Sequence, residues 1–135
     1  MHRQYLIYAA LFGGLAVALG AFGAHGLERI TQDEKILHGF HTGVQYQMYH
    51  ALALLFVVII YNDLGNKWLK WSANSFITGI LLFSGSLYLL TFLKIQSSSF
   101  TQYVGPLTPL GGIFFIIGWL FLLMGVLRKN DQRGK

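Results

Sequence analysis

The stretch Tyr5-Leu-Ile-Tyr-Ala-Ala-Leu-Phe-Gly-Gly-Leu-Ala-Val-Ala-Leu-Gly-Ala-Phe-Gly-Ala24 decides the fold class of this chain. It carries no charged residue, and a helix of about 20 apolar residues is long enough to cross the hydrocarbon core of a membrane. Arg3 before it and the small residues at its end resemble a secretory signal peptide, whose apolar part is only about 7–15 residues long. We therefore expect a retained membrane span at residues 5–24.

Three further apolar stretches, at residues 44–61, 72–92 and 110–127, have the length of membrane spans. Only 11% of the 135 residues are charged, whereas soluble domains carry about 25%. The sequence therefore predicts an all-α membrane protein, with four transmembrane helices in a compact bundle and one four-span domain over residues 1–135. The absence of cysteine excludes disulfides, thiol catalysis and thiolate metal sites.

The basic residues indicate an orientation in the membrane. Four spans place both termini on one side, which then carries seven basic residues: Arg3, Lys67, Lys70, Arg128, Lys129, Arg133 and Lys135. The other side carries three, Arg29, Lys35 and Lys94. Because cytoplasmic loops are enriched in Lys and Arg, we expect both termini in the cytoplasm. The same distribution argues against a nucleic-acid partner.

The first outer loop contains a helix start signal. Thr31-Gln-Asp-Glu34 matches a capping box, in which a Thr side chain and a Glu three residues later satisfy open backbone N–H groups. We expect an amphipathic surface helix that begins near Gln32 and continues into the second span. At the other outer connection, Ser97-Ser-Ser99 ends the third helix, and Pro109 suits the first turn of the fourth.

Small residues recur on the faces of two predicted spans. Lipid provides no hydrophobic force between helices, so they associate through close backbone approach at small residues. We expect helix packing, within the bundle or between copies of the chain, at Ala9, Gly13, Ala16, Gly20 and Gly23 in the first span and at Gly111, Gly118 and Gly125 in the fourth.

Polar side chains gather in the outer half of the predicted bundle, whereas the inner half is aliphatic and aromatic. At about 100° per residue, Tyr46, Gln47 and His50 lie within roughly 60° of one another, and Gln45 is turned away. We expect Gln47 and His50 to face inward, with His25 or Thr108 as partners. Because polar groups within a span mark functional sites, Tyr46, Gln47, His50, His25 and Thr108 form a candidate ligand-binding set. The alternative is a satisfied polar cluster that fixes helix register.

Metal binding and catalysis have weaker support. Glu34, His38 and His41 share one helical face at a spacing that zinc can use, but a solvated, pH-sensitive interfacial helix explains them better. We therefore expect no metal and no cofactor. No Asp or Glu lies within a predicted span, so no acid is present there to orient His50 as a base for a serine or threonine nucleophile. We do not expect an enzyme.

Three ordered segments closely resemble a known family. They are Leu19-Gly-Ala-Phe-Gly-Ala-His-Gly-Leu27, Tyr46-Gln-Met-Tyr-His50-Ala-Leu and Gly105-Pro-Leu-Thr-Pro-Leu-Gly-Gly112, followed by Gly118-Trp119. Together they resemble the YwdK/YgdD-like family of small bacterial multi-pass proteins, grouped as domain of unknown function 423. The resemblance implies four spans in the bacterial cytoplasmic membrane and supplies no activity. His38 and His41 lie outside these motifs.

These features give one leading functional hypothesis and two alternatives. The leading hypothesis is a non-enzymatic membrane protein that binds a small ligand, lipid or proton in an outer-leaflet polar pocket for transport or permeation. The first alternative is a structural or assembly factor that packs against other membrane proteins through its glycine-rich faces. The second is a metal- or histidine-dependent enzyme at the outer face. The expected partners are membrane lipids, further copies of the chain and other membrane proteins.

Overall fold

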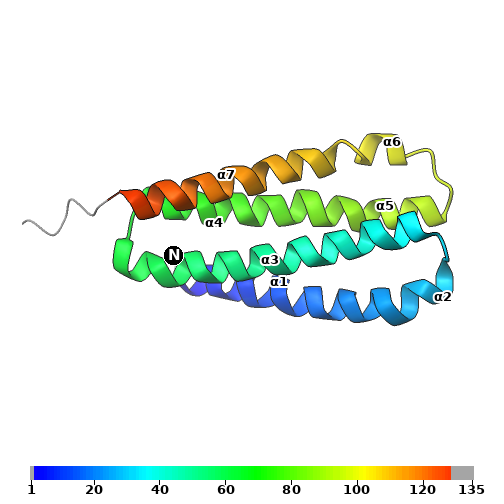
Figure 1. Cartoon of the computed structure of the whole chain (residues 1–135), viewed down its shortest axis with the longest axis horizontal. Coiled ribbons are helices and arrows are strands. Elements are labelled where there is room, and N and C mark those ends of the chain that lie inside the picture. Colours follow the sequence, from blue (N-terminus) through cyan, green and yellow to red (C-terminus); the bar gives the residue numbers. More distant parts are fainter. Residues whose placement is uncertain (1, 129–135) are drawn as a thin grey trace, which may run out of the picture.

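Two antiparallel helical hairpins form the molecule in the computed structural model, which describes residues 2–128 (Figure 1). The first hairpin pairs α1 (His2–Phe22), a π-helical turn η1 (Gly23–Leu27) and α2 (Glu28–Ile30) with the long helix α3 (Glu34–Leu64). The second pairs α4 (Lys67–Gly79), a π-helical turn η2 (Ile80–Ser84) and α5 (Gly85–Ile95) with α7 (Leu107–Leu127), which follows the short helix α6 (Thr101–Val104). The all-α four-helix architecture is confirmed.

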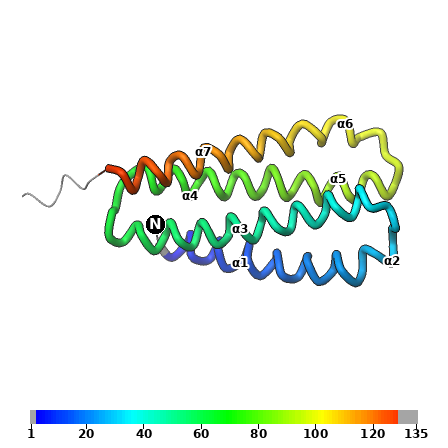
Figure 2. Tube along the Cα trace, in the orientation of Figure 1, coloured from blue at the N-terminus to red at the C-terminus, as the bar shows by residue number. Residues whose placement is uncertain are grey.

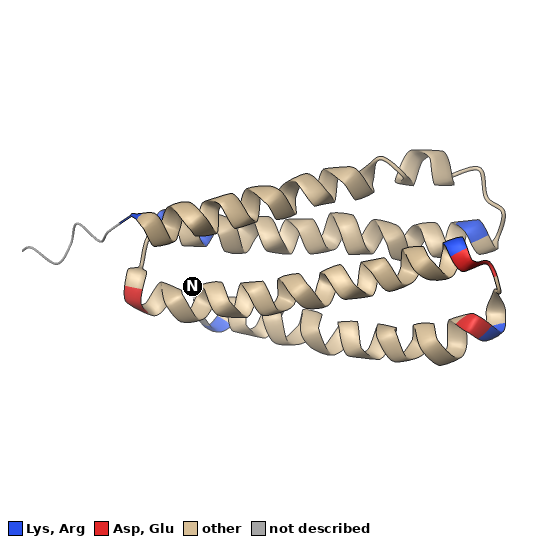
Figure 3. Cartoon of the chain, in the orientation of Figure 1, with Lys and Arg blue, Asp and Glu red and all other residues tan. Residues whose placement is uncertain are grey.

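Four helical stretches are long and apolar enough to cross a membrane: Arg3–Ile30, Glu34–Leu64, Lys67–Ile95 and Thr101–Leu127. The charged residues of the described chain lie at the two ends of the bundle, and the middle carries none (Figure 3). All four stretches exceed the predicted spans. With its 31 residues, α3 measures about 46 Å, whereas the hydrocarbon core is about 30 Å thick. The helix therefore tilts in the membrane, or its ends extend beyond the hydrocarbon core.

The helix α3 is the central element, because it contacts α1 on one side and α4, η2 and α5 on the other. The helices α4 and α7 pack closely along their length. Within residues 2–128, α1 makes at most marginal contact with α4, α5 and α7. The start of α1 and the end of α7 lie at the same end of the bundle (Figure 2).

The predicted capping box is wrong. The N-cap of α3 is Asp33, whose carboxylate accepts hydrogen bonds from the backbone N–H groups of Lys35 and Ile36 at 2.9 and 3.4 Å. The Thr31 hydroxyl instead accepts from the Asp33 N–H at 3.2 Å. Because the carboxylate is the stronger acceptor, it takes the capping position. The helix therefore begins at Glu34, two residues later than predicted.

The predicted surface helix is amphipathic and continues into the second span. Glu34, Lys35 and His38 are exposed, whereas Phe40, on the other face, is only 4% exposed. The Phe40 ring packs against the rings of Phe22 and Tyr88, with centroids 6.0 and 5.2 Å away. The first span continues through η1 to Leu27, which is also buried, so the aromatic side chains of this region have protein neighbours.

The connections elsewhere are shorter than predicted or contain extra structure. Residues 62–71, between the second and third predicted spans, are helical except for Gly65, in the left-handed conformation at φ 43°, and Asn66, the N-cap of α4. Beyond α5, Ser97 also has a positive φ of 52° and the chain turns as expected. Pro109 lies in the first turn of α7, where its missing N–H leaves no hydrogen bond unmade.

Three side chains at the start of or within the third span hydrogen-bond to carbonyl oxygens of glycines in neighbouring helices. The Asn66 amide donates to Gly125 O at 2.8 Å, and the Ser72 hydroxyl donates to Gly118 O at 2.8 Å. The Ser84 hydroxyl donates to Gly43 O at 2.7 Å. Glycine lets the two backbones approach closely enough for these short side chains to reach a carbonyl.

The closest approach joins the π-helical turn η2 to α7. A Cβ placed on Gly111 would collide with the backbone nitrogen of Phe83 and lie 2.7 Å from its Cα. A Cβ placed on Gly118 would lie 2.6 Å from the Phe76 ring, and one on Gly125 would lie 2.7 Å from a Leu69 methyl group. Backbone atoms cannot move aside as a side chain can, so Gly111 has the least tolerance for a larger residue.

We expect Gly111→Ala to lower the thermal unfolding temperature of the detergent-solubilised protein, with a free-energy cost of about 1–3 kcal/mol, typical of overpacking. The matched control is Gly112→Ala, because its Cβ would meet the Phe83 ring only at 3.8 Å. Both changes favour a helix equally, so the difference between them reports the close contact. Equal unfolding temperatures for the two variants would show that the backbones do not meet at Gly111.

Candidate functional site

His50 lies near the middle of α3 and is 5% exposed. It is sixteen residues from Glu34 and fourteen from Leu64, the two ends of the helix. The imidazole faces α7, where it stacks on the Phe115 ring with centroids 3.5 Å apart and an angle of 8° between the planes.

Both ring nitrogens of His50 have hydrogen-bond partners. The Nδ1 atom lies 2.7 Å from the Tyr46 carbonyl oxygen, and the Trp119 indole N–H donates to Nε2 at 3.2 Å. A carbonyl oxygen only accepts and an indole N–H only donates. The two partners therefore fix a neutral imidazole with its proton on Nδ1.

An open cleft of about 460 Å³ lies beside His50, between α3 and α7. His50 and Tyr46 line it from α3, and Phe115 and Trp119 line it from α7. Tyr46 and Trp119 are 39% and 49% exposed, so the cleft opens on the outer side of the helical bundle. Its volume falls within the range of about 300–1,000 Å³ that small-molecule sites occupy.

Gln47 is buried as expected, but it serves a different contact from His50. Its amide nitrogen donates to the Phe12 carbonyl oxygen in α1 at 2.8 Å, and its amide oxygen accepts from the Tyr88 hydroxyl in α5 at 2.7 Å. Gln47 therefore joins three spans, and it does not line the cleft beside His50. The structure buries both residues of the pair and directs them to different neighbours.

Of the three remaining candidate residues, Thr108 and His25 are not brought to His50, whereas Tyr46 is. Thr108 lies near the start of α7, and its hydroxyl is 2.6 Å from the Ser86 hydroxyl. His25 is exposed in η1. Tyr46 remains beside His50, with ring centroids 6.0 Å apart.

The glycine and alanine candidates for helix packing differ in how closely a neighbouring helix packs on them. Ala9, Ala16 and Gly23 are buried in the first span, and a Cβ on Gly23 would lie 2.9 Å from the Phe40 ring. Gly20 is half-buried, where a Cβ would lie 3.4 Å from Val44, and a Cβ on Gly13 would have no atom within 4 Å. Gly111, Gly118 and Gly125 are all buried against the third span.

The candidate chemical groupings do not form within residues 2–128. No group of three or more His, Asp or Glu side chains is placed to hold a metal ion there, so Glu34, His38 and His41 do not converge on one. The Ser84 hydroxyl binds Gly43 O, and the Ser86 hydroxyl contacts Thr108 and Phe83 O. Neither is hydrogen-bonded to His50, so the described chain shows no nucleophile paired with that base. Lys129, Arg133 and Lys135 lie outside the described residues.

The sequence reasoning missed the residues that complete both polar contacts. Trp119 and Phe115 hold His50, and Tyr88 holds Gln47. One signal was present for Trp119, since it is the lone tryptophan of the fourth predicted span and follows Gly118 directly. Tyr88 is likewise the lone tyrosine of the third predicted span.

Comparisons with known proteins agree on one family. A family model described as a protein of unknown function, DUF423, matches residues 19–112. The UPF0382 membrane protein of Haemophilus influenzae is 44% identical over 132 residues, which cover 97% of this chain and 99% of that protein. YwdK of Bacillus subtilis is 43% identical, with 93% of this chain and 98% of YwdK covered.

The UPF0382 inner membrane protein YgdD of Escherichia coli strain K12 is 38% identical over 96% of this chain and 94% of its own length. No solved structure matches the chain. Near-complete coverage at these identities shows a shared family and a shared multi-pass organisation. The chain therefore belongs to the DUF423 (UPF0382) family, multi-pass bacterial membrane proteins of unknown function.

Proposed function

We propose that this chain is a non-enzymatic protein of the bacterial cytoplasmic membrane that binds a small amphiphilic ligand in the cleft between α3 and α7. The observation that carries the proposal is the cleft itself. It is about 460 Å³ in volume, has mainly aromatic and aliphatic walls, and contains one buried imidazole. Such sites usually combine apolar walls with a few polar groups that orient the ligand.

The chemistry of the cleft favours a ligand with an apolar body and one hydrogen-bonding group. Its walls include Phe83, Phe115 and Ile116. Trp119 at the rim donates its N–H to His50, and the Tyr46 hydroxyl has no hydrogen-bond partner among the described residues. A ligand can therefore bond to Tyr46, or replace the Trp119 N–H as donor to His50.

A bound proton fits the observed geometry less well than a neutral ligand. Protonated histidine is a donor at both ring nitrogens. Its Nε2–H would then point at the indole N–H of Trp119, which is only 3.2 Å away and cannot accept. Proton binding would thus require Trp119 to turn away, whereas a ligand can occupy the cleft with this contact intact.

The proposal includes an orientation with both termini in the cytoplasm. Its support is the sequence, in which the side with both termini carries seven basic residues against three. Of the seven, Arg3, Lys67, Lys70 and Arg128 lie at one end of the described bundle (Figure 3). The opposite end holds Arg29, Lys35 and Lys94 together with Glu28, Asp33 and Glu34. The relative YgdD is described as an inner membrane protein, which supports the cytoplasmic membrane as the location.

To test whether a ligand is bound, the protein is purified from native membranes in mild detergent. Small molecules are then extracted from it and analysed by mass spectrometry. We expect one compound at about one copy per chain in the wild type. Ile113→Trp fills the cleft and should reduce it about tenfold, which corresponds to about 1.4 kcal/mol. The control is Leu123→Trp, on the same helix, outside the cleft lining and similarly exposed (55% against 52%). An equal amount of every compound in both variants would refute the cleft as the binding site.

A second candidate function is assembly, through the outer face of α1. Ala10, Gly14, Ala18 and Ala21 are exposed there, and a Cβ on Gly14 would have no atom within 4 Å. Since α1 packs mainly on α3, this small-residue face is free to approach a helix of another copy. We infer a homo-oligomer through this face.

We expect Gly14→Leu to shift the mass of the detergent-solubilised protein, measured by light scattering, to that of a single chain. The physical reason is that a large side chain prevents close helix approach. Val17→Leu, at an exposed position that already carries a branched side chain, is the control and should leave the mass unchanged. A Gly14→Leu protein with the wild-type mass would exclude this face as the interface.

A further inference from the structure

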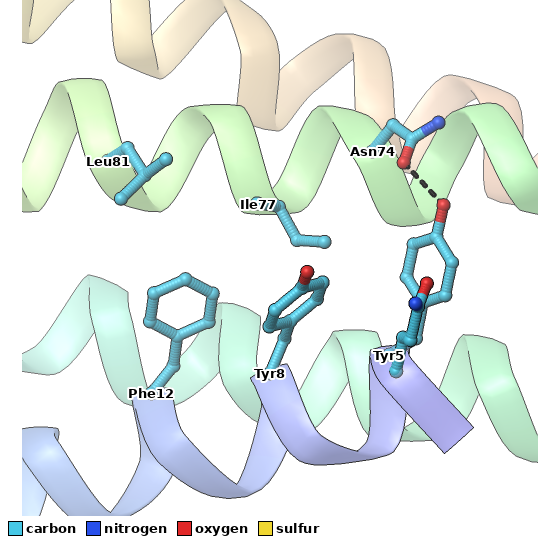
Figure 4. A pocket seen from close by; sticks show the side chains of 7 residues that line it. Tyr5, Tyr8, Phe12, Asn74, Ile77 and Leu81 are labelled. Atoms are coloured by element: carbon cyan, nitrogen blue, oxygen red, sulfur yellow. Dashed lines mark hydrogen bonds between the residues drawn. The ribbon is translucent and has the colours of Figure 1, made fainter. Parts of the chain in front are cut away.

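A second groove, which shares no lining residue with the ligand cleft, lies between α1 and α4. Its volume is about 500 Å³. Tyr5, Tyr8 and Phe12 line it from α1, and Asn74, Ile77 and Leu81 line it from α4 and the start of η2. The three aromatic side chains of α1 project across the gap toward α4 (Figure 4). The groove exists because α1 packs on α3 and makes at most marginal contact with α4.

Hydrogen bonds define both ends of this groove. At the end nearer the start of α1, the Tyr5 hydroxyl donates to the Asn74 side-chain oxygen at 2.7 Å (Figure 4). At the other end, Gln47 links the Phe12 carbonyl oxygen to the Tyr88 hydroxyl. The groove therefore occupies one half of the bundle's length and does not continue along α1 into the other half.

The groove changes from polar to apolar along its length. Its polar end contains Tyr5, Asn74 and Gln4, and the Gln4 amide and Tyr8 hydroxyl have no hydrogen-bond partner among the described residues. Its apolar end contains Phe12, Ile77 and Leu81. An occupant must therefore place a polar group toward the start of α1 and a hydrocarbon chain toward the middle of the membrane.

The charge at the polar end is positive. Lys70 is exposed one helical turn before Asn74, so it lies on the same face of α4 as the groove lining. Arg3, Lys67 and Arg128 lie at the same end of the bundle, where Asp63 is the one acidic residue within residues 2–128 (Figure 3). This charge complements an anionic group.

We propose that this groove binds one anionic phospholipid. Its phosphate lies near Lys70 and the Gln4 amide, and one acyl chain lies along Phe12, Ile77 and Leu81. A phospholipid is the surrounding solvent of a membrane span, and it combines the anionic group and the hydrocarbon chain that the two ends of the groove require. This site is separate from the proposed ligand cleft, so either can be wrong without the other.

The test uses protein reconstituted in phosphatidylcholine vesicles with a trace of spin-labelled phosphatidylglycerol or spin-labelled phosphatidylcholine. Electron paramagnetic resonance measures the fraction of each lipid whose motion is restricted by the protein. We expect wild-type protein to prefer phosphatidylglycerol about fivefold, the factor that one cation near an anionic group supplies. Lys70→Gln should abolish the preference.

Lys67→Gln is the matched control, because it removes the same charge from the same end. The Lys67 ammonium lies 5.3 and 5.6 Å from the ring centroids of Trp68 and Trp71, neither of which lines the groove. This variant should keep the preference. Equal losses in Lys67→Gln and Lys70→Gln would mean that the charge acts diffusely, and would overturn the proposal.

Ile77→Trp tests the groove itself, and Leu52→Trp, at an exposed position on α3, is its control. We expect the restricted fraction of phosphatidylglycerol to fall in the first variant only, and equal fractions in both would overturn the proposal.

Because the chain has no cysteine, Ile77→Cys also provides a single thiol. Efficient disulfide formation between two chains would show that a second copy occupies the groove, which would equally overturn it.

Discussion

In lipid, no hydrophobic force drives helices together. The rest of this structure depends on the close contacts and hydrogen bonds that the third span makes with its neighbours. Asn66, Ser72 and Ser84 each bond to the carbonyl oxygen of a glycine on a neighbouring helix. Because glycine has no side chain to keep the helices apart, the polar side chain can reach its carbonyl oxygen, an acceptor that the lipid hydrocarbon does not provide. Close contact and hydrogen bonding therefore occur at the same places.

The cleft beside His50 follows from this packing. A Cβ on Gly79 would collide with the Phe115 ring, so the bare glycine lets that ring lie against α4. Phe115 then stacks on His50, and the Phe76 ring, seated on Gly118, lies 5.3 Å from the Trp119 ring. The imidazole is thus held between aromatic rings whose positions are set by glycines on the facing helices.

The fold was largely predictable from sequence because long apolar runs have few alternatives in a membrane. The burial of Gln47 and His50 was also predictable, since helix periodicity places both on one side of α3. Their separation was not: a difference of about 60° on a helix does not tell which neighbour each residue meets. That depends on where α1, α5 and α7 lie around α3, which periodicity within one span does not encode.

Two errors had local causes. Thr31 and Asp33 can both cap a helix. The capping-box motif pointed to Thr31, whereas Asp33 caps α3 in the structure. The bounds of the first and third spans were too short because a helix can continue past its apolar run, as these two do to Ile30 and Ile95.

The most direct test of the account is a double-mutant cycle between Ser72 and Gly118, with the free energy of unfolding measured by titration from mild detergent into dodecyl sulfate. In the wild-type background, Ser72→Ala should cost about 0.6 kcal/mol, the average for hydrogen bonds between membrane helices. In the Gly118→Ala background the helices already stand apart, so the account predicts that Ser72→Ala costs almost nothing. An equal cost in both backgrounds would show that the hydrogen bond does not depend on the close approach at glycine, and would contradict the account.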